Sequence, residues 1–184
     1  MPIPSEFNVA HGVGAICVFI GVVLHIIGLA TPNWTTATFR YMNPLLSPSE
    51  YTADVSVGLW MDCDKGGCST IKSYNLTGAW RAAGAFAILG MLSSFVTLAV
   101  AIVHIAMPFF QKLQFEVMSL VTLATSIATV MLIIICVSCF GGGVHNVFVW
   151  TEKSIGYSLV LSIIGGIVVF LGGVIFYIPR LRKT

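Results

Sequence analysis

Charged residues are scarce in this sequence of 184 residues. They make up 9 % of the chain, against the roughly 25 % that is usual in soluble domains, while apolar residues make up 57 %. The net charge of +2 is too small to indicate a nucleic-acid-binding surface. No linker or low-complexity tract divides the chain. The composition therefore predicts a single membrane domain that does not bind nucleic acid.

The sequence also lacks the residue patterns on which enzymes and coupled transporters depend. All 7 acidic residues fall outside its long apolar runs. No nucleophile, zinc or phosphate-binding motif of a known type is present. The 4 histidines have no metal-ligand spacing, and Cys136 and Cys139 have no second pair of ligands. We therefore expect no enzyme, no cofactor and no metal site.

Long apolar runs are what the sequence has in abundance. A helix needs about 20 apolar residues to cross a bilayer. Four runs without Asp, Glu, Lys or Arg reach that length: residues 12–31, 82–107, 117–140 and 155–178. They predict a mainly α membrane protein, in which a left-handed bundle of four transmembrane helices carries a small extracellular antiparallel β-sheet. The first run is not preceded by a basic residue, so we interpret it as a span and not as a signal peptide.

The loops between the runs differ in length and orient the chain. Residues 32–81 and 141–154 are predicted to be extracellular, and residues 108–116 cytoplasmic. Basic residues next to a span prefer the cytoplasm, and three follow the fourth run: Arg180, Arg182 and Lys183. Both termini are therefore expected in the cytoplasm, and the protein in the plasma membrane.

The first loop carries chemistry of the secretory pathway. It contains Cys63 and Cys68, together with N-glycosylation sequons at Asn33 and Asn75. Disulfides and N-linked glycans form in the secretory lumen, so both features indicate that this loop lies outside the cell. Each sequon lies near a predicted membrane edge, where the glycosylating enzyme reaches poorly, and Asn75 is the better candidate.

The first loop also has the composition of β-strands. Residues 35–41 are rich in β-branched and aromatic side chains, and residues 55–63 alternate apolar and polar ones. A glycine-rich turn separates the latter from residues 69–74, so that Cys63 faces Cys68 across a hairpin. A disulfide at this position would fix the register of the hairpin.

The remaining outer segments add one strand and several tryptophans. Residues 144–150 are expected to form a strand at the edge of the same sheet. All 4 tryptophans lie in the outer loops or at the outer membrane edge, where an aromatic belt forms. We therefore interpret Trp80 as an anchor in the headgroup layer.

The order of residues in the first loop resembles that of the claudin superfamily. This superfamily includes the claudins, the peripheral myelin and epithelial membrane proteins, and the calcium-channel γ and stargazin-type subunits. The resemblance covers nearly the whole chain but leaves the branch open. Its residues are Trp34, Gly58, Leu59, Trp60, Cys63, Cys68 and Arg81.

This resemblance implies architectural roles. An extracellular sheet would pack on the four-helix bundle, with Cys63 and Cys68 joined by the family disulfide. Trp34 and the Gly58–Trp60 segment would seat the sheet on the bundle, and Arg81 would cap the second helix beneath it.

The chain departs from claudins at two places. Four residues separate its cysteines, fewer than claudins usually have, so the hairpin tip is short. The last residues, Leu181 to Thr184, lack the apolar terminal residue of scaffold-binding claudins. We therefore expect no anchoring to a PDZ scaffold through this tail.

Two functions from different classes are open at this point. The first is a claudin-like cell–cell junction and adhesion protein that self-associates in the membrane and forms a paracellular barrier or pore. The length of the first loop favours it. The alternative is an auxiliary subunit that docks on an ion channel or receptor and modulates its gating or trafficking. The expected partners are thus the lipid bilayer and either the protein itself or another membrane protein.

The spans contain small and polar residues of their own. In the fourth span a spacing of seven puts Gly165 with Gly172, and Gly166 with Gly173, on shared faces. Small residues let helices approach closely in lipid, so the stripe serves either packing within the bundle or docking of another membrane protein. His25 lies in the middle of the first span. One hydrogen bond to a neighbouring helix would satisfy it, and an ion or proton relay is the alternative.

Overall fold

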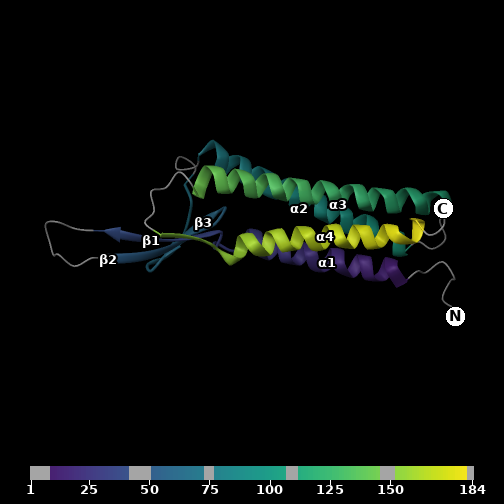
Figure 1. Cartoon of the computed structure of the whole chain (residues 1–184), viewed down its shortest axis with the longest axis horizontal. Coiled ribbons are helices and arrows are strands. Elements are labelled where there is room, and N and C mark those ends of the chain that lie inside the picture. Colours follow the sequence, from purple (N-terminus) through teal and green to yellow (C-terminus); the bar gives the residue numbers. More distant parts are fainter. Residues whose placement is uncertain (1–8, 42–50, 73–76, 107–111, 146–151, 182–184) are drawn as a thin grey trace.

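A computed structural model describes residues 9–41, 51–72, 77–106, 112–145 and 152–181. Within these residues, four long helices lie side by side and a small sheet extends from one end of them (Figure 1). The helices are α1 (Val9–Ala30), α2 (Gly78–Ala106), α3 (Lys112–Phe140) and α4 (Tyr157–Leu181). All four are long and apolar enough to cross a bilayer. The predicted fold class is confirmed.

The second helix begins earlier than a count of uncharged residues suggests. Thr77 caps it, because its hydroxyl accepts a hydrogen bond of 3.2 Å from the Trp80 backbone N–H. The helix therefore starts at Gly78, and its first turn contains Arg81, which lies outside the expected span.

In the part of the chain that the structure describes, five antiparallel strands form one sheet, in the spatial order β4-β3-β2-β1-β5. The expected strand at residues 35–41 is observed as β1. The bounds of the strands are β1 (Thr35–Tyr41), β2 (Tyr51–Val57), β3 (Met61–Asp64), β4 (Gly67–Thr70) and β5 (Glu152–Ile155).

The segment from 55 to 63 was expected to form one strand, and this was wrong. The chain turns between β2 and β3, where the Gly58 N–H donates to the Met61 carbonyl at 2.8 Å. A Cβ at Gly58 would lie 2.6 Å from Pro32 Cα, so only glycine fits this turn against the end of the first helix. Alternation of side chains extends to Cys63 in the sequence, but backbone contact with Pro32 interrupts the strand.

The fifth strand also differs from the expected one. Residues 144–150 do not supply it: Gly141–His145 forms a π-helical turn, and 146–151 lie outside the described residues. The strand is Glu152–Ile155, which pairs with β1 on the side opposite to β2. Because α1 and α4 lie side by side, the segment that leaves α1 and the segment that enters α4 emerge together and pair (Figure 1).

Small residues repeated every seven positions join α1 to α4. A Cβ at Gly21 would lie 2.7 Å from the Gly165 carbonyl oxygen, so the two backbones are in direct contact. A repeat of seven is the period of left-handed helix pairs. The contacts run in antiparallel register, and the facing pairs are Gly14 with Gly172, Gly21 with Gly165, and Gly28 with Ser158.

The other two glycines of α4 face α3. A Cβ at Gly166 would lie 2.6 Å from Ile133 Cδ1, and one at Gly173 would lie 2.2 Å from Ser126 Oγ. All the glycines of the stripe are thus covered by helices of the same chain. The stripe packs within the bundle and offers no surface for docking another protein.

His25 of α1 is bound to the same neighbouring helix. Its Nδ1 shares a hydrogen bond of 2.9 Å with Ser162 Oγ of α4, and the side chain is 1 % exposed. The expected hydrogen bond to a neighbouring helix is present, but it does not satisfy the whole side chain, because Nε2 is buried without a hydrogen-bond partner among the described residues.

Hydroxyl groups, in place of glycines, join α2 to α3. Thr129 donates to Ser93 Oγ at 2.9 Å, and Ser93 donates to the Thr125 carbonyl at 3.2 Å. Many hydroxyl side chains of these two helices are buried and bond to carbonyls of their own helix. They are Ser94, Thr97, Thr122 and Ser126.

Candidate functional site

Backbone hydrogen bonds attach the sheet directly to α1 and α4. At the end of the bundle next to the sheet, the Gly156 N–H donates to the Trp34 carbonyl and the Ser158 N–H donates to the Asn33 carbonyl, each at 3.0 Å. Ser158 Oγ in turn accepts bonds from the Thr31 hydroxyl and the Asn33 N–H. A side chain on Gly156 would collide with Asn33, because its Cβ would lie 1.9 Å from the Asn33 oxygen. The sheet is therefore fixed to these two helices without a flexible linker.

Two tryptophans fill the space between the sheet and the helices. Trp34 is fully buried and donates through Nε1 to the Gly28 carbonyl at 2.8 Å. Trp80 is 4 % exposed and donates through Nε1 to the Leu59 carbonyl at 3.1 Å. Both rings pack against Phe140 of α3, with centroids at 5.0 and 6.2 Å. The interpretation of Trp80 as a headgroup anchor was therefore wrong.

The Gly58–Trp60 segment lies at the same junction. Leu59 is 3 % exposed and belongs to the apolar cluster that contains both buried tryptophans. Trp60 is 40 % exposed, and its ring lies on Gly84 of α2, where a Cβ would be 3.2 Å from two ring carbons. The absence of a side chain at Gly84 gives the indole room on the helix.

The other predicted positions have separate places. Arg81 is exposed, and its backbone N–H donates to the Thr77 carbonyl at 3.1 Å. Asn33 is half-buried in the junction with its side-chain oxygen buried, which does not favour a glycan there. Asn75 lies outside the described residues.

A disulfide joins Cys63 and Cys68, which are paired across the β3–β4 hairpin. The last pair of the hairpin is Asp64 with Gly67, and two residues, Lys65 and Gly66, form the turn between them. The turn is closed by the Gly66 N–H, which donates to Asp64 Oδ1 at 2.7 Å, and Gly67 has a φ of +131° that suits glycine. The hairpin at the far edge of the sheet is thus compact.

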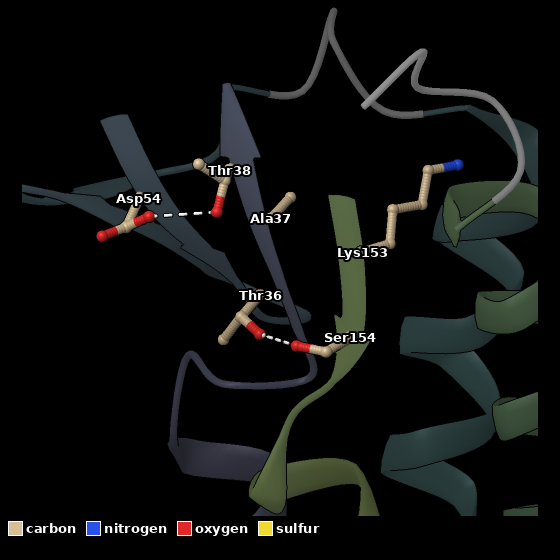
Figure 2. A pocket seen from close by; sticks show the side chains of 6 residues that line it. All are labelled: Thr36, Ala37, Thr38, Asp54, Lys153 and Ser154. Atoms are coloured by element: carbon tan, nitrogen blue, oxygen red, sulfur yellow. Dashed lines mark hydrogen bonds between the residues drawn. The ribbon is translucent and has the colours of Figure 1, made fainter. Parts of the chain in front are cut away.

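A polar hollow of about 330 Å³ lies over β1, β2 and β5. In Figure 2, Thr38 and Asp54 form one bonded pair and Thr36 and Ser154 another, while Lys153 points away from Asp54. Thr38 donates to Asp54 Oδ1 at 3.0 Å. On β1 and β2 these groups lie on the face opposite to the buried side chains of Ala37 and Val57, because side chains alternate along a strand.

The described residues of this hollow can form hydrogen bonds with a partner. Its hydroxyls donate and accept, and Asp54 adds an acceptor and a negative charge. The described part of its lining contains no histidine or cysteine. The sequence analysis missed these residues, although the alternation of Thr36 and Thr38 with the apolar Ala37 and Phe39 was a signal for them.

A cluster of rings at the opposite end of the bundle also escaped the sequence analysis. His11 of α1, His104 of α2 and Phe176 of α4 have ring centroids 4.8 Å apart in each pair. Across the part of the chain that the structure describes, no three His, Cys, Asp or Glu side chains could together hold a metal ion.

A sequence model of the PMP-22/EMP/MP20/Claudin family matches residues 9–176. The match begins at the first residue of α1, includes all five strands and ends within α4. A comparison with curated proteins finds no match.

Proposed function

The chain belongs to the PMP-22/EMP/MP20/Claudin family, and we propose that it is a claudin-like junction protein that associates with copies of itself through its extracellular sheet. It is a multi-pass protein whose four apolar helices lie in a lipid bilayer. The role is one of adhesion and assembly, with no catalytic step.

The fixed attachment of the sheet carries this proposal. Ordered assembly in a membrane requires that one surface of each copy meets another surface at a constant angle. Hydrogen bonds at Gly156 and Ser158 tie the sheet to the helices, so the polar hollow has a constant direction relative to the membrane. A sheet on a flexible linker would not support such an assembly.

The arrangement of the helices supports the proposed orientation. The sheet carries the disulfide, which forms in an oxidising compartment. The start of α1 and the end of α4 lie at the opposite end of the bundle (Figure 1). We therefore propose that the sheet lies outside the cell and that both termini lie in the cytoplasm. We propose the plasma membrane at cell–cell junctions as the location of the protein.

Mixing cells that lack junctions tests this function. Expressed alone with a fluorescent tag, the protein should concentrate where two expressing cells touch, and not where one touches a non-expressing cell. Asp54→Arg should weaken this enrichment, because it reverses the charge in the hollow. Lys72→Glu changes the net charge by the same amount in the opposite direction but lies outside the strands, and should leave the enrichment unchanged. An even distribution of the wild-type protein would contradict the proposal.

The short hairpin favours a second candidate, an auxiliary subunit of a channel or receptor. Its tip of two residues offers little protruding surface for contact across a gap between cells. The glycine stripe no longer supports this candidate, because helices of the same chain cover it. A subunit would stay diffuse when expressed alone and would purify from native tissue with a channel or receptor.

A further inference from the structure

An apolar groove of about 350 Å³ runs between α3 and α4, in the half of the bundle next to the sheet. From Val130 to Ser138 on α3 it extends over about 12 Å, at 1.5 Å per helical residue. Its floor is closed where Ile133 reaches Gly166. Its rims are open, because Ile134 is 53 % and Ile167 47 % exposed on the lipid-facing surface.

The walls of this groove are stiff. Six of its lining residues are β-branched, and such side chains have few rotamers in a helix. The groove therefore keeps its shape and cannot be filled by rotation of its own side chains. These residues are Val130, Ile133, Ile134, Val137, Ile163 and Ile167.

An occupant must come from the hydrocarbon of the bilayer, and the lining indicates its chemistry. Among the described residues of the lining, Ser138 is the one polar residue, and it lies near the end of α3 that is next to the sheet. Phe170 lines the opposite end. The groove thus offers one hydroxyl at the outer end of an otherwise apolar, rigid slot.

We propose that this groove binds a sterol. A sterol has one hydroxyl at one end of a rigid ring system, which matches the single hydroxyl of Ser138 at the outer end. Its rings lose little conformational freedom on binding, whereas an acyl chain must immobilise many torsions. An acyl chain also has no polar group along its length for Ser138 to bond. The sterol rings would contact the stiff walls and so gain dispersion attraction that is absent when the groove is unfilled.

Photolabelling of the purified full-length protein tests this site. The chain is placed in phosphatidylcholine nanodiscs with a photoreactive, alkyne-tagged cholesterol analogue, and labelled peptides are mapped by mass spectrometry. Labels should gather on residues 130–138 and 163–170, and an excess of unlabelled cholesterol should displace them.

Matched variants separate the groove from the general lipid surface. Ile167→Phe fills the groove and should lower labelling about ten-fold. Ile164→Phe makes the same change on the same helix at a similar exposure of 43 %, but outside the groove, and should leave labelling unchanged. Ser138→Ala should lower the apparent affinity about five-fold through loss of one hydrogen bond. Ser138→Thr, which keeps the hydroxyl, should retain it.

Three results would overturn the proposal. Labels spread evenly over all four helices would mean that the analogue marks only the lipid surface. Labelling of the groove by an acyl-chain probe that cholesterol fails to displace would identify a phospholipid chain as the occupant. Cross-links between two copies through the groove would identify a second copy.

Discussion

The bundle consists of two helix pairs that are joined by different means. Between α1 and α4 the backbones touch at three successive levels of the repeat, where glycine faces glycine at two levels and Gly28 faces Ser158 at the third. Between α2 and α3 the contacts include side-chain hydroxyls, of which Thr129 and Ser93 bond directly across the interface. Lipid provides no hydrophobic drive between helices, so both pairs rely on packing and hydrogen bonds.

This difference indicates which of the two helix pairs tolerates amino-acid substitutions at its interface. Backbone contact has no adjustable side chain, so even one added methyl group must separate the helices. A hydroxyl network loses one bond at a time, and hydroxyls in helices also bond to their own backbone. The intolerant pair is the one whose ends continue into β1 and β5 and hold the sheet. We infer that close packing of α1 on α4 sets the position of the sheet.

The largest effect should follow an added methyl group between α1 and α4. In Gly165→Ala the new Cβ would lie 2.7 Å from the His25 backbone nitrogen and 2.8 Å from the Gly21 oxygen. We expect the free energy of unfolding in mild detergent to fall by roughly 3 kcal/mol, the upper end of overpacking penalties.

Gly78→Ala is the matched control for this variant. No atom lies within 4 Å of a Cβ at Gly78, at the start of α2. The free energy of unfolding of the control should equal that of the wild-type protein or be slightly higher, because alanine favours helix formation more than glycine does. Equal unfolding free energies for Gly165→Ala and the control would show that α1 and α4 are not in backbone contact.

Removal of the disulfide should have the next largest effect. The double variant Cys63→Ser, Cys68→Ser opens a small ring, worth about 2 kcal/mol to the hairpin in the chain-entropy model. Delivery to the cell surface should fall, as measured by surface biotinylation. The helix pairs should keep their stability, because among the described strands the hairpin pairs with β2, and β2 does not continue into a helix. A wild-type protein whose electrophoretic mobility is unchanged by reductant would refute the predicted bond.

The attachment of the sheet to α2 should be weaker than its attachment to α1 and α4. Trp80→Phe replaces the buried indole by a smaller aromatic ring and removes the donor to the Leu59 carbonyl. It should cost at least about 1 kcal/mol, because lost packing adds to the lost hydrogen bond. Hydrogen exchange should speed up at residues 58–61, while residues 156–158 stay protected. Equal deprotection of both segments would mean that the two helix pairs hold the sheet alike.

The smallest effect should come from the hydroxyl interface. Thr129→Val removes the bond to Ser93 at nearly constant volume, and should cost about 0.6 kcal/mol, the average for hydrogen bonds between membrane helices. A double-mutant cycle with Ser93→Ala measures the coupling directly. A coupling energy between Thr129 and Ser93 as large as the loss of unfolding free energy in Gly165→Ala would contradict the proposed difference between the two helix pairs.

Much of the fold could be predicted because it depends on local composition. Uncharged runs predicted four helices, and β-branched residues predicted β1. The glycine repeat of α4 was also visible. Its partner repeat at Gly14, Gly21 and Gly28 has the same period, but the pairing depends on which helices become neighbours and in which register. A repeat on one helix does not contain that information.

The candidate site was predictable only in part, for a similar reason. The cysteines are close in sequence, so a hairpin brings them together and spacing alone indicates the pair. The polar hollow joins Thr36 to Ser154, which are 118 positions apart. The prediction for Trp80 was wrong because tryptophan is common at the membrane edge, and the sequence does not show which segments will cover it. Its burial results from contact with Leu59 and Phe140 on other segments. Long-range contacts of this kind become visible only in the folded chain.

Freeze-fracture electron microscopy of the protein, expressed alone in cells without junctions, tests self-association most directly. Our account predicts continuous strands of particles at contacts between expressing cells, because each copy holds its sheet at the same angle. Strands should become short or absent with Gly165→Ala, which disturbs the helices that fix that angle. Scattered single particles with the wild-type protein would contradict self-assembly and favour an auxiliary subunit.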